Sequence, residues 1–340
     1  MNAISIAFDT KAGALVVNRV ARLVLHADDF GMSVSVNQGI IAGFSAGLLT
    51  STSILANAPA ARQAAVAWRI LDLERSTGRL PSLEARSRLN DVGAPFDLGV
   101  HLNLTQGRPL TGGLYPPQLL DGEGRFPGVF PLLARLASGG SRYRQAIRRE
   151  LSRQVEFVLD QGLPVTHLNG HQYVEMLPVV SGIVPDLLAH YSIPVVRVAR
   201  ERGLATTTLR RSFRPAQWAL GQVKRLFAAS YARRIDRCAT PHPRDYFGTA
   251  HAGTIDLGAM ESYLALIRGG TTEIGIHPGM ADEHAASPRA DGWSDPLSTL
   301  RPRELELLCS SELANVLARR KLSLARLSDL TAAAAIRRAA

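Results

Sequence analysis

Carboxylate and imidazole side chains stand at the ends of several short apolar runs in this chain. Two adjacent aspartates, Asp28 and Asp29, end one such run, and His101, His171 and His277 stand at the ends of others. Adjacent carboxylates repel each other, so they need a cation or hydrogen bonds to be tolerated in a folded protein. One aspartate and two histidines are a common ligand set for a divalent metal that keeps a position open for water. The pattern therefore predicts a metal site with further titratable groups beside it.

These residue types together predict metal-assisted hydrolysis. A metal with an open position acidifies its bound water and polarises a carbonyl oxygen. A second carboxylate could take a proton from that water, and a histidine from another strand could protonate the leaving group. Two alternatives stay open at this point. Asp28 and Asp29 could cap the helix that follows them, because aspartate is a favoured N-cap, and a single strand-end histidine is more often a hydrogen-bonded structural residue.

Short β-type runs alternate with helical patterns along the chain, and the polar residues stand at the carboxyl ends of the β-type runs. Strands are predicted at 22–27, 51–55, 97–104, 166–171, 193–198, 273–279 and 322–327, and helices at 34–48, 60–73, 141–161, 179–190 and 302–319. Such alternation favours an α/β fold with a mainly parallel sheet. No GxGxxG segment follows the first strand, so a dinucleotide-binding fingerprint is absent. Because barrel sites are assembled from the carboxyl ends of several strands, we expect a barrel, similar to a TIM barrel, rather than an open sheet.

The composition is that of a globular protein. The chain has 340 residues, of which 46% are hydrophobic and 20% are charged, which excludes extended disorder and collagen-like structure. No apolar stretch approaches the roughly 18 residues that a membrane-spanning helix needs. The first residues lack a signal-peptide pattern, and two cysteines are too few for a disulfide framework. A cytoplasmic location is therefore expected.

The formal net charge of +10 belongs to one segment of the chain. Residues 197–244 hold twelve basic and two acidic residues, so their excess equals that of the whole chain. Because a nucleic-acid-binding protein carries its basic residues over a face built from several elements, we expect no nucleic-acid partner. Residues 209–237 have the pattern of a basic helix with aromatic residues. Such a helix either packs its apolar stripe on the barrel, which we favour, or contacts a membrane peripherally at the inner face.

Several motifs, in the same order, resemble those of the YdjC-like (ChbG/HpnK) family of carbohydrate deacetylases. They are the runs from His26 to Ser33 and from Gly47 to Ser53, Asn37-Gln-Gly39-Ile40, Gly99-Val-His101-Leu-Asn-Leu-Thr105, Gly107-Arg-Pro-Leu110, Thr166-His-Leu-Asn-Gly-His171-Gln, Glu273-Ile-Gly-Ile-His277-Pro-Gly279 and Arg303-Glu-Leu. The resemblance covers about residues 21–330. It implies one distorted (β/α) barrel domain over that range with a basic insertion at about 200–245, an extension over 1–20 and a tail over 331–340.

The resemblance implies an enzyme that removes the acetyl group from an N-acetylated sugar, either an oligosaccharide or a lipid-linked glycan. At the matching positions, Asp29, His101 and His171 correspond to ligands of a divalent metal, Mg²⁺ or Zn²⁺. Asp28 corresponds to the general base and His277 to the general acid. Amide hydrolysis needs an activated water, a stabilised oxyanion and a proton for the departing nitrogen, which such groups supply. The alternatives are a metal hydrolase of another bond and a non-catalytic glycan- or lipid-glycan-binding protein on the same barrel.

Two positions depart from the family pattern, and three more are candidate substrate contacts. The family usually has aspartate at the place of Asn169 and often histidine at the place of Tyr173. An asparagine forms hydrogen bonds but does not raise the basicity of a metal ligand as a carboxylate does. Asn103, Arg197 and His167 are the candidate substrate contacts; the alternatives are a surface salt bridge for Arg197 and a structural or ligand-supporting role for His167. A homodimer is the base-rate expectation for the assembly.

Overall fold

The computed structural model describes residues 6–7, 16–17, 21–79, 96–201, 215–249, 251–282, 285, 287 and 289–332. Its centre is an eight-stranded sheet in the order β7-β6-β5-β4-β3-β9-β8, with β10 paired to β3. Every recorded pair in this sheet is parallel. The α/β fold with a parallel sheet is thereby confirmed. The strands are β3 (Ala21–Phe30), β4 (Ser51–Ile54), β5 (Asp97–Leu102), β6 (His167–Gly170), β7 (Val195–Val196), β8 (Asp245–Phe247), β9 (Gly270–Ile276) and β10 (Ser323–Leu324).

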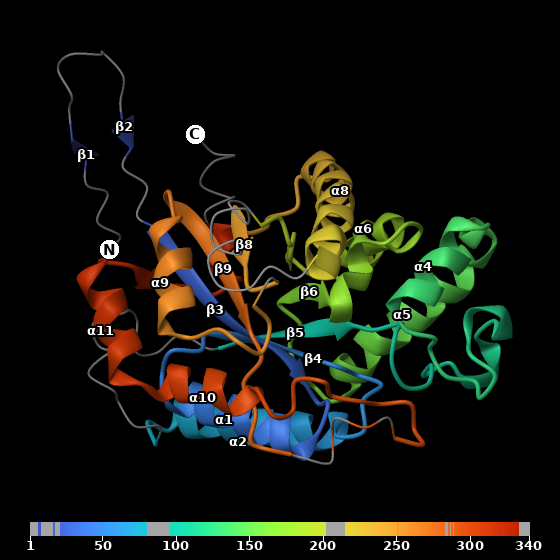
Figure 1. The fold of residues 1–340 in the computed structure, drawn as a ribbon, viewed down its shortest axis with the longest axis horizontal. Coiled ribbons are helices and arrows are strands. Elements are labelled where there is room, and N and C mark those ends of the chain that lie inside the picture. Colours follow the sequence, from blue (N-terminus) through green and yellow to red (C-terminus); the bar gives the residue numbers. More distant parts are fainter. Residues whose placement is uncertain are drawn as a thin grey trace.

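The sheet curls into a distorted barrel (Figure 1). No strand ladder joins β7 to β8 among the described residues. Two backbone hydrogen bonds cross this side: Val196 N–H donates to the carbonyl of Pro241 (3.2 Å), and Tyr246 N–H donates to the carbonyl of Arg200 (3.4 Å). The barrel is therefore closed weakly at one side, while the carboxyl ends of its strands still gather at one end.

Helices cover the outside of the sheet. In Figure 1, α1 (Val34–Ser45), α2 (Ala61–Ser76) and α10 (Arg301–Cys309) lie together on one side, and α1 contacts both of the others. On another side, α5 (Arg144–Asp160) packs against α6 (Val180–His190) and β5. The remaining helices are α4 (Val129–Ala137), α8 (Pro215–Arg237), α9 (Leu257–Ala265) and α11 (Ser311–Arg319), with short 3-10 turns at η1 (Gly112–Leu114), η2 (Pro117–Leu119), η3 (Gly140–Tyr143) and η4 (His171–Met176).

Strand β3 lies at the centre of the sheet and ends in the two aspartates. Leu23 and Leu25 are fully buried, as expected for a parallel strand that is covered on both faces and appears in the sequence as a continuous apolar run. Near its end the register with β4 shifts between Ala27 and Phe30, and Asp29 has a φ of 70°. Because a register shift and a left-handed residue re-aim successive side chains, Asp28 and Asp29 reach different partners.

The predicted elements occur close to their expected places, with one correction and three additions. The helix expected at 302–319 is two helices, α10 and α11, because Ser310 is extended (ψ 140°) and its hydroxyl accepts a hydrogen bond from Leu313 N–H as the N-cap of α11. Around the main sheet, the α-helices and strands that were not predicted are α4, β8 and α9. The strand β8 has three residues, which is too short to show a period of two.

The basic insertion contains the expected helix. In the described second half of α8, Ala228, Tyr231 and Ile235 are buried, whereas Leu226 is 73% exposed. This half contacts α6 and η4, which is the packing of an ordinary surface helix. Residues 202–214, which include the start of the predicted helix, and residues 333–340 of the tail lie outside the described residues.

The extension over 1–20 contains β1 (Ile6–Ala7) and β2 (Val16–Val17), which pair with each other in antiparallel fashion and form a separate sheet. In the described ranges, no helix combines the length and the apolar character that crossing a membrane requires. Cys238 and Cys309 are exposed free thiols.

Candidate functional site

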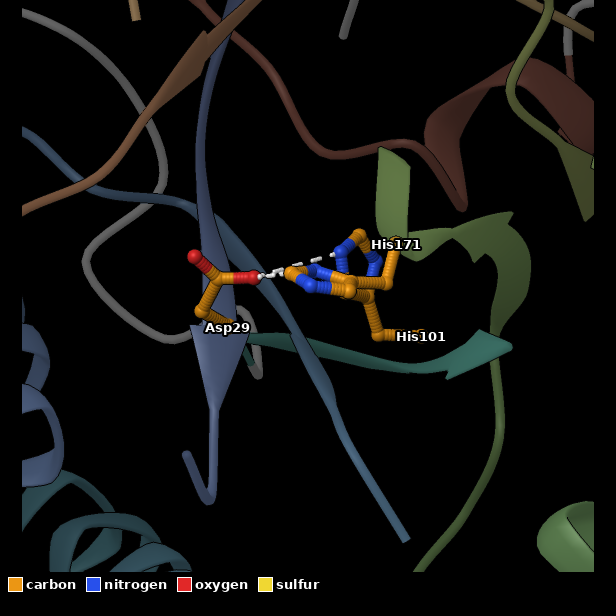
Figure 2. A group of neighbouring side chains, drawn as sticks. All are labelled: Asp29, His101 and His171. Carbon is orange, nitrogen blue, oxygen red and sulfur yellow. Dashed lines mark hydrogen bonds and ion pairs between the residues drawn. The ribbon is translucent and has the colours of Figure 1, made fainter. Parts of the chain in front are cut away.

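Three of the predicted residues meet at the carboxyl ends of neighbouring strands. Asp29 is the last residue but one of β3, His101 is the last but one of β5, and His171 directly follows β6. The Nδ1 atom of His171 lies 2.9 Å, and the Nε2 atom of His101 3.5 Å, from the same oxygen of Asp29, Oδ1 (Figure 2). The three side chains are buried, and one ligand atom from each lies within 4.8 Å of the others. A carboxylate oxygen and two imidazole nitrogens at this spacing could hold a divalent metal ion.

The second oxygen of Asp29 is occupied by an arginine. Nη2 of Arg301 donates to Oδ2 of Asp29 (2.7 Å), and the same guanidinium donates to Asp295 from Nε (2.7 Å) and Nη2 (3.0 Å). Burial alone would raise the pKa of Asp29, but Arg301 and the two histidines outweigh it and hold this pKa well below its usual range. Asp29 is therefore ionised, with its free oxygen directed at His101 and His171. It does not cap α1, because Ser33 accepts the capping hydrogen bond from Val36 N–H.

Asp28 has a different set of partners from Asp29. Arg197 donates to both of its oxygens, from Nη1 (2.9 Å) and Nη2 (2.8 Å), and also donates to Glu273 from Nε (2.8 Å) and Nη2 (2.7 Å). The guanidinium is fully buried and lies 4.9 Å from the ring centre of Tyr246. Burial would raise the pKa of Asp28, but Arg197 above all, with His101 and His26, holds it well below its usual range.

His277 stands beside Asp28 at the open side of the site. It follows β9, and its Nε2 atom lies 3.8 Å from Oδ2 of Asp28. Its backbone N–H donates to Oε2 of Glu304 (2.6 Å), which anchors the turn after the strand. Its side chain is 12% exposed, against 0% for Arg197 on the other side of Asp28. His277 is therefore the partner of Asp28 that a bound molecule can reach.

A cavity of about 690 Å³ opens over Asp28, Asp29, His101, His171 and His277. Most of its walls are apolar and come from α4, η4, α8 and the segment before α10. The apolar lining residues are Met32, Val129, Phe130, Leu133, Tyr173, Met176, Leu177, Phe227, Ala252, Pro296 and Leu297. A polar hollow of about 390 Å³ adjoins it and shares Gln106, Val129 and Gln172 with it. The site is thus a charged floor with one apolar and one polar recess above it.

The three candidate substrate contacts lie away from the described cavity lining. Asn103 is buried and shapes the loop after β5, where its Oδ1 accepts from Thr105 N–H (2.9 Å). His167 packs edge-on against His26 inside the barrel, with ring centres 5.0 Å apart, and burial holds its pKa well below its usual range. Arg197 forms an ion pair that is buried, so the alternative of a surface salt bridge is wrong. Substrate contact by these three residues stays a prediction.

Several residues of the site were not predicted from the sequence. Arg301 neutralises Asp29, and Glu273 shares the Arg197 guanidinium with Asp28. Gln106 places its amide nitrogen 3.2 Å from Nε2 of His171. Glu273 opens the Glu273–Gly279 motif, and Arg301 stands two residues before Arg303-Glu-Leu. Both lie in or beside motifs that carried the resemblance, which was the available signal.

A family model described as YdjC-like protein matches residues 22–319. The chain belongs to the YdjC-like family. Apart from the first residue of β3, the matched range contains every strand of the main sheet except β10, which follows it, and it contains all five residues around the cavity floor. The expected family is thereby confirmed over most of the chain.

Curated relatives of the chain are named carbohydrate deacetylases. The Geobacillus stearothermophilus protein is 35% identical over 185 residues, which cover 54% of this chain and 63% of that relative. The chain therefore matches less than two thirds of this relative's length. The mouse protein is 29% identical over 333 residues, covering 91% of this chain and 94% of its own.

A solved structure has the same fold. It is an Enterococcus faecalis V583 protein described as a candidate cellobiose-phosphate cleavage protein, with a TM-score of 0.64 and 20% sequence identity. The superposition covers 92% of this chain and 99% of that protein. This likeness supports the distorted barrel.

Proposed function

We propose that this YdjC-like protein is a divalent-metal-dependent enzyme that hydrolyses the N-acetyl group of a sugar. The observation that carries the proposal is the buried Asp29–His101–His171 group at the floor of a cavity, with Asp28 and His277 beside it. The names of the relatives support the reaction and the substrate class. Asp29, His101 and His171 would hold the metal. This ligand set suits Zn²⁺ by its softness, whereas Mg²⁺ prefers more oxygen ligands.

A bound divalent metal would supply an acidified water and polarise the acetyl carbonyl. Asp28 is ionised throughout the physiological range, because Arg197 holds its pKa far down, so it can accept a hydrogen bond and then a proton from the attacking water. A carboxylate with such a low pKa is a weak base, and its main contribution is to orient that water. His277 lies 3.8 Å from Asp28 and lines the cavity, where it can protonate the departing nitrogen.

The cavity walls favour a sugar that carries an apolar group, such as a lipid-linked glycan, over a long oligosaccharide. Apolar contact surface contributes about 25 cal/mol per Å², whereas sugar hydroxyls placed against the side chains of α4 and η4 would lose hydrogen bonds to water. The polar hollow beside Gln106 and Gln172 is the place for a hydroxyl-rich part. Peripheral membrane contact through residues 209–237 belongs to this proposal, since the exposed Leu226 and the lining residue Phe227 are neighbours on α8.

Acetate release tests the reaction directly. Chelated protein is reloaded with Zn²⁺, Mg²⁺, Mn²⁺ or Co²⁺ and assayed on N-acetylated monosaccharides, oligosaccharides and lipid-linked glycans. We expect metal-dependent acetate release, highest on a glycan with an apolar group. We expect Asp28→Asn to lower kcat by about 10²–10⁴-fold while metal binding persists. Glycan binding without acetate release would favour the non-catalytic alternative, and metal binding without release from any substrate would favour another scissile bond.

A further inference from the structure

Asn169 in β6 lies between the Asp29–His101–His171 group and the side chains around Asp28. It is fully buried, with His101 on one side and His26 and Arg197 on the other. One atom of its amide lies 2.7 Å from Nδ1 of His101, and the other lies 3.1 Å from both Nε2 of His26 and Nη2 of Arg197. An amide has one accepting and one donating end. The two sides of Asn169 therefore cannot receive the same kind of hydrogen bond.

One orientation of the amide satisfies every neighbour. Its oxygen accepts from Arg197 Nη2 and His26 Nε2, and its nitrogen donates to His101 Nδ1 and, at 2.8 Å, to Ser53 Oγ. A guanidinium only donates, so Arg197 favours this orientation. Both hydrogens of its Nη2 already bond Asp28 and Glu273, so the reversed amide loses only a shared contact there. In a neutral His101 the proton then sits on Nε2, the nitrogen that faces Asp29. His26 likewise keeps its proton on Nε2, which lies 3.2 Å from Oδ1 of Asp28.

A metal held by His101 requires the opposite arrangement. A ligating nitrogen must be unprotonated, so the proton of His101 moves to Nδ1 and needs an acceptor, which is the oxygen of Asn169 in the reversed amide. The amide nitrogen of Asn169 then faces Nε2 of His26. This Nε2 atom can accept a hydrogen bond only if the proton of His26 moves to Nδ1, which lies 3.7 Å from Glu273. Burial and Arg197 lower the pKa of His26, so its ring is neutral and can hold the proton on either nitrogen.

We propose that Asn169 couples cation binding at His101 to the hydrogen bonding of His26 below Asp28. When a cation binds, the amide turns over and His26 no longer donates to Asp28. The hydroxyl of Ser53, which lies 3.1 Å from His26 Nε2 and 3.3 Å from His101 Nδ1, can rotate to suit both arrangements. Asn169 is a positioning residue that acts through two histidines, and the inference rests on the proposed metal site.

An aspartate at position 169 would break this coupling. A carboxylate accepts on both sides, so it would take hydrogen bonds from His101 Nδ1 and from His26 or Arg197 at once. His101 would then hold its proton on Nδ1 with or without a cation, and His26 would have no reason to change. The asparagine of this chain thus makes the surroundings of Asp28 depend on the cation.

Nitrogen-15 NMR of the histidines of the full chain tests the coupling, with Zn²⁺ alone as the probe. Chelated protein is titrated with zinc at about pH 8.5, where an ordinary histidine is neutral, and signals are assigned with single-histidine variants. In the native protein we expect both His101 and His26 to change from Nε2- to Nδ1-protonated when zinc binds. In Asn169→Asp we expect His101 to be Nδ1-protonated before zinc is added and His26 to stay unchanged.

Gln106→Glu is the matched control, because it places a carboxylate beside the other histidine, His171, and away from His26. By chelator competition, both Gln106→Glu and Asn169→Asp should tighten zinc binding by about tenfold or more, but only Asn169→Asp should abolish the response of His26. A native protein in which zinc changes His101 and leaves His26 unchanged would overturn the coupling and leave the metal site standing. Absence of zinc binding would overturn both, and acetate release reports on the reaction separately.

Discussion

The floor of the cavity and its walls are built in different ways. On the floor, each charged group has a fixed partner: Arg197 holds Asp28, and Arg301 holds Asp29. The walls consist of apolar side chains from helices and loops outside the sheet. Ion pairs with several hydrogen bonds fix geometry and protonation, whereas apolar contact is non-directional. The charged floor and the apolar walls can therefore change independently of each other.

Removing a ligand on the floor should have the largest effect. His101→Ala takes away one of the three atoms proposed to hold the metal, so we expect zinc affinity to fall by more than about 100-fold and acetate release to fall below detection. His190→Ala, at an exposed position on α6, is the control and should change neither quantity. Chelator competition and acetate assays measure the two effects. Native zinc affinity in His101→Ala would remove this residue from the ligand set.

Removing the cation that pairs with a buried carboxylate of the floor should lower the free energy of unfolding, and not only metal binding. Arg197→Met leaves Asp28 and Glu273 as two buried carboxylates without their cation, so we expect a loss of about 3–5 kcal/mol in the free energy of unfolding. Arg144→Met breaks an exposed ion pair with Asp186 and should cost less than about 1 kcal/mol. Urea unfolding compares the two variants. Equal losses would mean that burial does not set the value of the Arg197 pair.

Changing a wall should affect only substrates with an apolar group. Phe130→Ala shortens an apolar side chain of α4 that lines the cavity, so we expect KM for an apolar-linked glycan to rise by about tenfold. We expect kcat, and KM for a free N-acetylated sugar, to stay within about twofold. Leu114→Ala, at a position that is 68% exposed, is the control. A uniform rise in KM for all substrates would contradict the division between floor and walls.

The turn η4 belongs to both regions, since it begins with His171 and also carries wall residues, and Glu175 lies buried within it. No hydrogen bond to its carboxyl oxygens is recorded among the described residues, and burial raises its pKa to about 7. An unfolded glutamate titrates near 4.3, so the folded state binds the extra proton and stability falls as pH rises from about 4 to 7.

Glu175→Gln should remove that decline. Urea unfolding at about pH 5 and pH 8 should show a loss of about 2–3 kcal/mol in the native protein, beyond any loss in the variant. Glu312→Gln, at an exposed position on α11, should behave as the native protein does. The same pH dependence in native protein and Glu175→Gln would assign the decline to other groups.

The fold and the floor were predictable because strand ends are visible in the sequence. The central strands are covered on both faces, so they appear as apolar runs that stop at Asp28, His101 and His277. Their partners were not visible, because the ion pair from Arg197 to Glu273 spans 76 positions and that from Arg301 to Asp29 spans 272. Nothing local predicts which distant arginine neutralises a carboxylate.

The walls and the weakly closed side were not predictable. Periodicity in α4 indicates that Val129 and Leu133 are covered, but not whether protein or a bound molecule covers them. The strands beside the weakly closed side, β7 and β8, have two and three residues, which is too short for a pattern. The split at Ser310 depends on one hydroxyl that caps α11, and a continuous apolar period runs across it.

The central strand β3 pairs with segments that the ribosome synthesises at very different times. Along β3, the end pairs with β4, the part from Ala21 to Ala27 pairs with β9, and the start pairs with β10. About 240 residues separate β3 from β9, which at about 5–20 residues per second takes the ribosome about 10–50 s. During that time one edge of an apolar strand that already carries both aspartates has no partner, and open strand edges promote aggregation. The newly made chain is therefore expected to depend on chaperones until residue 276 has left the ribosome.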